Sequence, residues 1–98
     1  MASFVWLDGF LGSQLRDNVR ILHIESLKGR NVKEPMYEKI PCIYWNRLPN
    51  CELTRLSKGA FVSIKGRIES NDDIGAYVLV ESIQFLLPPG KDVEKFDI

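Results

Sequence analysis

Apolar and polar residues alternate along most of this chain, and that alternation limits the folds open to it. In residues 61–70, Val62, Ile64 and Ile68 fall on one side of an extended strand, and mostly polar residues fall on the other. Successive side chains of a strand point to opposite faces, so a period of two indicates a strand with one buried face. Similar runs predict four further strands, over residues 4–11, 19–27, 40–45 and 77–87.

The alternation stops between the third and fourth predicted strands. Leu53 and Leu56 lie three residues apart, which places them on one side of a short helix over residues 51–57. Asn50 is a suitable N-cap for this helix, and Gly59 is a suitable left-handed stop after it. Five strands with one helix between the third and the fourth is the element order of an OB-fold. We therefore expect an all-β fold with one short helix, a five-stranded OB-fold Greek-key barrel.

The length of 98 residues suits one domain. We expect the OB-fold domain to cover residues 1–88 and a short polar tail, residues 89–98, to fray after the Pro88-Pro89-Gly90 stop. No run approaches the roughly 18 apolar residues of a membrane helix, and the first residues lack the charged start of a signal peptide. These features favour a cytoplasmic, nucleoid-associated protein with no membrane partner.

Cysteine and histidine are too few for a metal cage. A structural zinc site takes four Cys or His ligands in close pairs, and the chain has only Cys42, Cys51 and His23. We expect both thiols to be small core or half-buried residues in a reducing compartment, and His23 to be a sheet histidine with its hydrogen bonds satisfied. No nucleophile–base pair and no glycine-rich phosphate loop is present. We therefore expect no enzyme activity, no catalytic residues, no metal and no cofactor.

The net charge is zero, but the charges are unevenly distributed. Residues 1–66 hold ten Lys and Arg against six Asp and Glu, whereas residues 67–98 hold three against seven. Such an asymmetry indicates either a polyanionic partner for the basic part or an acidic tail. The excess of four charges predicts only weak electrostatic attraction.

Three segments resemble a known family when taken in order. These are CIYWNRLPNCELTRLSKG at 42–59, AFVSIKGRI at 60–68 and VESIQFL at 80–86, preceded by LDGFL at 7–11. Together they resemble bacterial single-stranded DNA-binding proteins, whose third strand, helix, Lys-Gly turn and last two strands follow this order. The short chain also resembles the primosomal replication-restart protein of the same family.

The resemblance implies non-sequence-specific binding of single-stranded DNA in replication, recombination or repair. It also implies a homo-oligomer, a dimer or a tetramer, with replication proteins as further partners. Trp45 falls where the family places a base-stacking aromatic residue, and Arg47 matches a basic position just beyond it. Lys39 and Asp73 stand where well-known members have further aromatic residues, which weakens the match at those two positions.

Basic residues interleave with an aromatic residue in the aperiodic segment 28–39. This segment is either a flexible basic finger in which Tyr37 stacks a base, or a solvated hairpin whose charge Glu34 and Glu38 reduce. Cations also lie on the outward face predicted for the fourth strand. The predicted nucleic-acid contacts are Trp45, Tyr37, Arg47, Lys39, Lys33, Arg30, Lys65, Lys28 and Arg67.

Phe4, Trp6 and Phe10 lie on the outward face predicted for the first strand. Exposed aromatic residues usually mark an interface, so we expect an oligomer interface here, with a base-stacking platform as the alternative. Two alternatives to DNA binding also stay open at this stage. The domain could prefer RNA, or it could be an OB-fold adaptor for protein partners, which the acidic second half favours.

Overall fold

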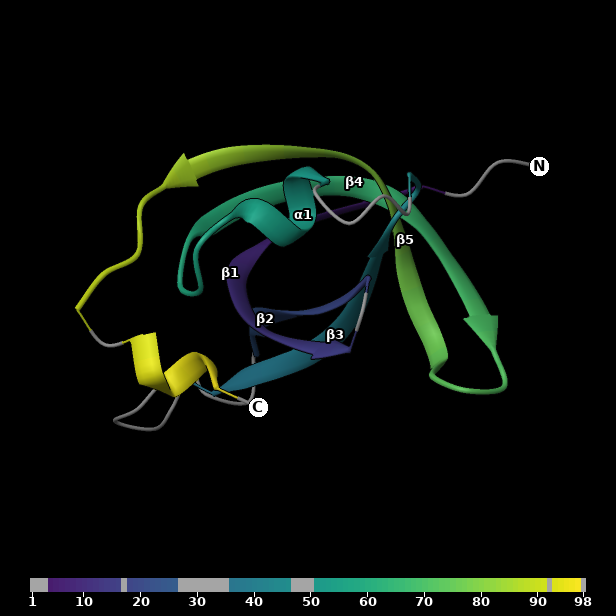
Figure 1. The fold of residues 1–98 in the computed structure, drawn as a ribbon, viewed down its shortest axis with the longest axis horizontal. Coiled ribbons are helices and arrows are strands. Elements are labelled where there is room, and N and C mark those ends of the chain that lie inside the picture. Colours follow the sequence, from purple (N-terminus) through teal and green to yellow (C-terminus); the bar gives the residue numbers. More distant parts are fainter. Residues whose placement is uncertain (1–3, 17, 27–35, 47–50, 92, 98) are drawn as a thin grey trace.

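The computed structural model describes residues 4–16, 18–26, 36–46, 51–91 and 93–97. Its strands are β1 (Val5–Arg16), β2 (Val19–Glu25), β3 (Tyr37–Tyr44), β4 (Phe61–Asn71) and β5 (Gly75–Leu87); helix α1 (Glu52–Arg55) precedes β4, and the 3₁₀ helix η2 (Val93–Phe96) follows β5. The strands form a closed barrel in the order β1-β2-β3-β5-β4 (Figure 1). Every pairing is antiparallel except the short parallel one between β3 and β5. The expected OB-fold Greek-key barrel is confirmed.

The barrel interior is filled by one face of each strand. Leu11, Leu22, Val62 and Val80 are fully buried there, and Leu53 of α1 closes one end of the same core. The alternation in the sequence predicted Val62 on the inward face, because the pleat turns every second side chain inward.

Helix α1 is shorter than the sequence predicted, with four residues against an expected seven. Cys51 holds its N-cap position without a side-chain cap hydrogen bond, and the predicted cap Asn50 lies outside the described residues. Gly59 has a φ of 91°, so its predicted left-handed conformation is confirmed. It does not stop the helix, which already ends at Arg55 with Leu56 as an extended C-cap. The Gly59 N–H donates to the Leu11 carbonyl, so the turn after the helix is joined directly to β1.

Arg20 anchors α1 from inside the barrel wall. Its side chain is buried, its Nε donates to the Gly12 carbonyl at 3.0 Å, and its Nη1 donates to the Leu53 carbonyl at 3.0 Å and to the Leu56 carbonyl. Carbonyls at a helix C-terminus lack intrahelical partners and carry partial negative charge, so a cation suits this place. Burial lowers the pKa of Arg20 from its ordinary value.

Gly66 allows β4 and β5 to approach closely where their register shifts. The shift lies between Lys65 and Gly66, and a Cβ at position 66 would lie 2.1 Å from the Leu79 carbonyl oxygen. A side chain there would collide with backbone, which explains why the strand pattern is interrupted by glycine.

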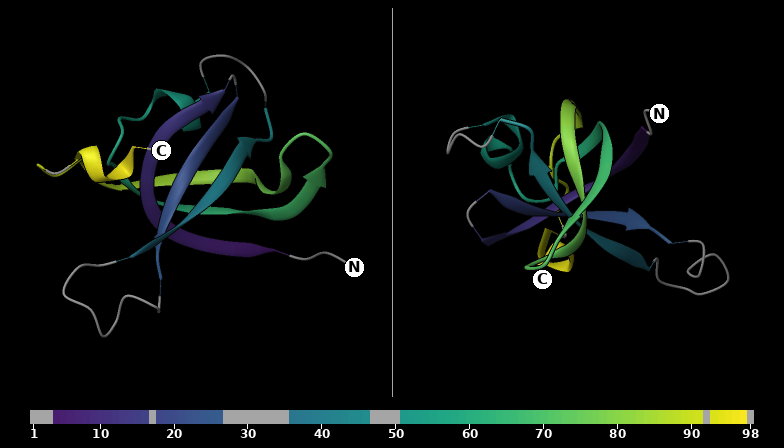
Figure 2. Two further views of the ribbon diagram at one scale, coloured as in Figure 1. Left: turned by 90° about the horizontal axis from the view of Figure 1, so that it is seen from below. Right: turned by 90° about the vertical axis from the view of Figure 1, so that its right-hand side faces the viewer.

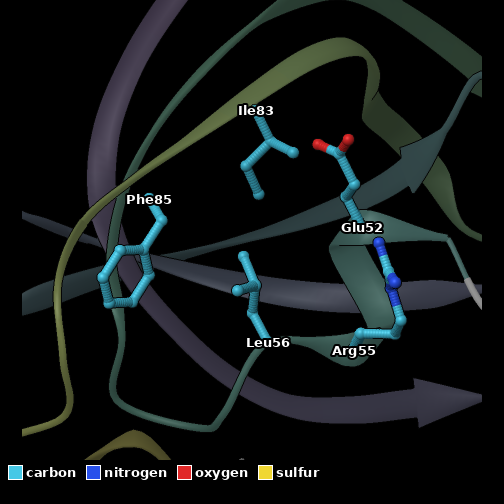
Figure 3. Close-up of a pocket in the computed structure, with 5 residues that line it drawn as sticks. All are labelled: Glu52, Arg55, Leu56, Ile83 and Phe85. Atoms are coloured by element: carbon cyan, nitrogen blue, oxygen red, sulfur yellow. The ribbon is translucent and has the colours of Figure 1, made fainter.

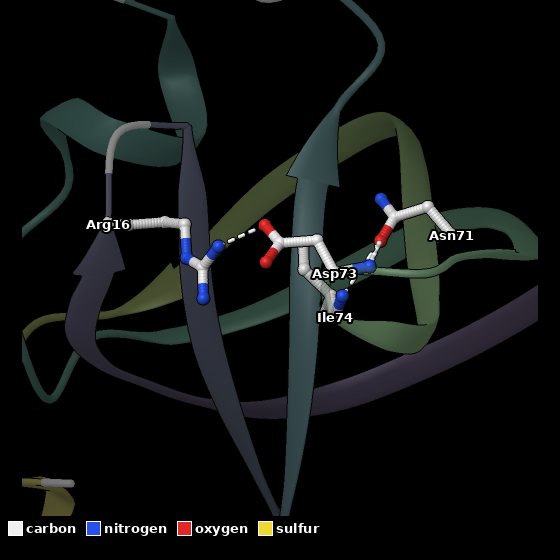
Figure 4. A network of polar contacts seen from close by, with 4 residues as sticks. All are labelled: Arg16, Asn71, Asp73 and Ile74. Carbon is white, nitrogen blue, oxygen red and sulfur yellow. Dashed lines mark hydrogen bonds and ion pairs between the residues drawn. The ribbon is translucent and has the colours of Figure 1, made fainter.

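The β4–β5 hairpin extends beyond the barrel. Its turn is closed by Asn71, whose side-chain oxygen accepts hydrogen bonds from the N–H groups of Asp73 and Ile74 at 3.0 and 2.8 Å (Figure 4). Asp73 also forms an ion pair with Arg16 at the end of β1. The Asp73 carboxylate is therefore already paired with a cation.

Ile68 is 58% exposed, so its predicted inward position is wrong. Its place in the alternation is inward, but the pairing of β1 with β4 ends at Gly66, so beyond that point β4 pairs only with β5 among the described strands. The opposite face of the hairpin instead packs on the barrel. Alternation places Ile43 on the same face as Trp45, yet Ile43 is buried in a second cluster with Tyr77 and Val19.

The end of the chain folds back onto the barrel. Phe96 is 3% exposed, and its ring stacks on Phe10 with centroids 4.8 Å apart. Asp97 accepts a hydrogen bond from Lys58. The expected fraying is therefore wrong for η2, because an apolar ring in the polar tail finds an aromatic site. This helix and the start of β1 lie at opposite ends of the barrel (Figure 1, Figure 2).

Candidate nucleic-acid-binding surface

Trp45 stands at the rim of the barrel directly after β3. Its N–H donates to the Val80 carbonyl at 2.8 Å, which extends the β3–β5 pairing by one residue. Tyr44 turns toward the core, so the next side chain turns outward. The Trp45 residue is 58% exposed, and its ring touches only one described aromatic neighbour, Tyr44, at a centroid distance of 6.1 Å. The indole is held at the backbone while most of its surface faces solvent.

An open hollow of about 370 Å³ lies beside this indole. It is lined by Trp45, Leu79, Arg67 and Glu81. Arg67 Nε donates to Glu81 Oε1 at 3.1 Å, and both side chains are partly exposed. An exposed ion pair of this kind contributes about 0–1 kcal/mol, so a phosphate can compete for the guanidinium. The hollow combines an aromatic wall, an aliphatic contact and a cation.

Two further aromatic rings lie around a lysine on the β1–β4 side of the barrel. Lys65 Nζ is 4.8 Å from the centroid of Phe4 and 5.4 Å from that of Trp6. The two aromatic residues are 50% and 69% exposed. Residues assigned from the sequence to different roles, an oligomer interface and a phosphate contact, are therefore brought together.

Tyr37 and Phe10 lie elsewhere, in a cluster closed by the end of the chain. Tyr37 begins β3 and pairs with Glu25, so it does not belong to a flexible segment as predicted. Its ring makes edge contacts with Phe10 at 6.0 Å and with Phe96 at 5.5 Å. Phe10 is covered by Phe96 and does not share the open surface of Phe4 and Trp6.

Lys39 is exposed in β3, opposite His23 of β2. Trp45 follows it by six positions, which places the two about 20 Å apart along an extended chain. The structure thus does not bring Lys39 to the hollow beside Trp45. Four other predicted contacts lie outside the described residues, namely Arg47, Lys33, Arg30 and Lys28.

A second hollow, of about 260 Å³, lies between α1 and β5. Leu56, Ile83 and Phe85 give it an apolar lining, and Glu52 and Arg55 stand at its helical side (Figure 3). Phe85 is 49% exposed. Of the predicted nucleic-acid contacts that the structure describes, none lines this hollow.

Thiol and imidazole groups are poorly placed for chemistry. Burial raises the pKa of Cys42 to about 12, so its thiol stays protonated. Burial and the charge of Lys39 lower the pKa of His23, although the Phe96 backbone acts in the opposite direction. Its Nε2 has no hydrogen-bond partner among the described residues. In the same part of the chain, no three His, Cys, Asp or Glu residues gather as a metal site.

The sequence did not reveal that the Lys65 ammonium lies against two rings, or that Phe96 covers Phe10. The only available signal for the second contact was one aromatic residue among the acids of the tail. Both contacts join residues far apart along the chain. Among the described residues, no helix has the length and apolar character needed to cross a membrane.

A closed five-stranded barrel with a short helix before β4 defines an OB-fold protein. No family model matches the chain, and no curated protein does. Among solved structures, the chain is similar to the mitochondrial single-stranded DNA-binding protein Rim1 of S. cerevisiae. The two are 18% identical with a TM-score of 0.61, over 91% of this chain and 98% of the other. This likeness shows that they share a fold.

Proposed function

We propose that this protein binds single-stranded DNA without sequence preference, with a base stacked on Trp45. The exposed indole beside an open hollow that contains Arg67 is the observation that carries this proposal. Stacking contributes about 1–3 kcal/mol per base and tolerates any sequence, because every base has a π-face. Arg67 and Lys65 supply charge for phosphates close to the stacked bases.

The fold and its likeness to a solved structure support the proposal. OB-fold barrels commonly bind oligonucleotides on one side of the barrel. The protein to which this chain is similar carries single-stranded DNA binding in its name. The predicted phosphate contacts Lys39, Arg47, Lys33, Arg30 and Lys28 belong to the proposal as further cations along the strand.

The family resemblance extends the proposal to a biological setting. We assign the protein to the bacterial single-stranded DNA-binding family, in a short form similar to the primosomal restart protein. It acts without enzyme activity in replication, recombination or repair, in the cytoplasm at the nucleoid. It works as a homo-oligomer, a dimer or a tetramer, and meets replication proteins there.

A fluorescence titration tests the stacking on Trp45. Trp6→Phe removes the other indole while keeping a ring, so that all indole emission comes from Trp45. We expect an oligo-dT of about 20 nucleotides to quench this emission at low salt. Trp45→Ala should weaken binding, measured by anisotropy of the labelled oligonucleotide, by about 5- to 150-fold, and Trp45→Phe should retain most of it.

Two results would contradict the proposal. A folded protein that fails to bind oligo-dT at low salt is not a single-stranded DNA-binding protein, and the adaptor alternative would then take its place. Equal affinities of the wild type and Trp45→Ala would exclude this indole as the stacking residue. An oligo-U competitor in the same assay separates a DNA preference from an RNA preference.

A further inference from the structure

The surface of Phe4, Trp6 and Lys65 is built differently from a protein–protein interface. The two rings are largely exposed, and the Lys65 ammonium lies within 5.4 Å of both ring centroids. No carboxylate among the described residues forms an ion pair with this ammonium. Covering an unpaired cation with a second protein surface removes it from water at a considerable cost, and lysine is depleted in interface cores.

Single-stranded nucleic acid satisfies these groups better than a protein does. A base can stack on an aromatic face while its phosphate pairs with the neighbouring ammonium. The nearest acid of β1 is Asp8, which alternation places on the same outward side as Trp6. The cation that lies against both rings, Lys65, belongs to β4. Arg67 lies two residues further along the same strand.

The register of the barrel joins this surface to Trp45. Val5 pairs with Gly66, Gly66 pairs with Val80, and Val80 pairs with Tyr44, so one row crosses four strands. The outward residues beside this row are Trp6 on β1, Lys65 and Arg67 on β4, Leu79 and Glu81 on β5, and Trp45 after β3. Three strand spacings separate the ends of the row, a span of about 14 Å.

We propose that Phe4, Trp6 and Lys65 form a second base-stacking platform, and that one DNA strand crosses β4 and β5 between this platform and Trp45. The proposal rests on the proposed function, because it extends the path of the same ligand. It replaces the oligomer interface expected for Phe4 and Trp6 with a nucleic-acid surface. The Arg67–Glu81 pair lies between the two platforms and opens to a phosphate there.

The experiment compares single alanine variants in binding to an oligo-dT of about 20 nucleotides at low salt. Trp6→Ala and Trp45→Ala each remove an exposed indole. Phe85→Ala is the control, because it removes an aromatic ring of a residue that is 49% exposed and lines the other hollow, beside α1. We expect the two tryptophan variants each to lose about 5- to 150-fold in affinity, and the control to stay within twofold. Lys65→Gln should weaken binding and reduce its salt dependence by about one phosphate contact.

Light scattering on the same samples distinguishes a platform from an interface. Lost affinity of Trp6→Ala at unchanged particle mass supports the platform. A lower particle mass, or unchanged affinity while Trp45→Ala loses it, overturns the platform and leaves the proposed function intact. Absence of binding by the wild type would overturn both proposals together.

Discussion

At the scale of single residues, position 66 shows how little space separates two paired strands. Gly66 lies where the register of β4 against β5 shifts, with the Leu79 carbonyl directly above its Cα. We expect Gly66→Ala to lower the free energy of unfolding by about 1–3 kcal/mol or more, because backbone must move to admit the methyl group. Urea unfolding measures the effect.

Gly90→Ala provides a matched control, since a Cβ there meets nothing within 4 Å. This variant should unfold at nearly the same urea concentration as the wild type. If Gly66→Ala were equally neutral, the close approach of β4 and β5 would not matter for stability.

His23 is a second residue with a measurable consequence. It is 1% exposed, and burial together with Lys39 lowers its pKa below the ordinary value of 6.5. Below the unfolded pKa the unfolded chain therefore binds more protons than the folded one. Stability should be fully present above about pH 6.5 and fall below it, by at most about 1.4 kcal/mol per pH unit.

Thermal or urea unfolding between pH 7.5 and 5.5 tests this dependence. His23 is the single histidine, and carboxylates titrate mainly below this window. His23→Gln should flatten the profile. If the stability of His23→Gln still fell with pH across this window, another titratable group would be responsible.

At the scale of elements, α1 depends on the barrel for its existence. Four residues are too few for an independently stable helix. Arg20 holds the carbonyls of Leu53 and Leu56, and Leu53 fills the end of the core. We expect Arg20→Met to cost about 3 kcal/mol in unfolding free energy, because two buried carbonyls and one partly buried carbonyl lose their donor.

Arg55→Met is the control for this prediction, since Arg55 is an exposed arginine of the same helix. It should change unfolding free energy by less than about 0.5 kcal/mol. Equal effects of the two substitutions would mean that the buried hydrogen bonds of Arg20 contribute nothing specific.

The 3₁₀ helix η2 also depends on one tertiary contact. Phe96 packs against the rings of Phe10, His23 and Tyr37. Phe96→Ala should destabilise the protein by about 3–5 kcal/mol, the usual cost of deleting a buried phenylalanine ring. Glu94→Ala, at an exposed position of the same helix, should have little effect. If Phe96→Ala left the free energy of unfolding unchanged, the Phe96 contact would not stabilise η2, and the tail would be frayed as its polarity predicts.

At the scale of the whole molecule, electrostatics limits how strongly DNA can be bound. The net charge is zero, so attraction to a polyanion comes from local cations only. With about four phosphates engaged, the logarithm of affinity should fall with the logarithm of salt concentration at a slope near −3. Anisotropy titrations at several salt concentrations measure this slope. A slope near zero would mean that the cations next to the rings do not contact phosphate.

The barrel order and most of the core were predictable from the sequence. The inward positions of Val62 and Ile64 follow from alternation, and the left-handed conformation of Gly59 follows from glycine after a short helix. These features are local, because the pleat and the helix turn are set by neighbouring residues. Ile68 was assigned wrongly, since alternation gives the face of a strand but not where the neighbouring strand ends.

The surface depended on contacts between distant parts of the chain. The sequence indicated an outward Trp45, and the described structure has that ring exposed. It could not indicate that Lys65 lies against Phe4 and Trp6, or that Phe96 covers Phe10 and Tyr37. Local pattern therefore determined the face of the strand on which most residues lie, but not whether that face is covered. Only the tertiary structure decided which outward residues meet. Strand register places Lys65 beside Trp6, about sixty positions away, and the packing of η2 on the barrel places Phe96 on Phe10, about 86 positions away.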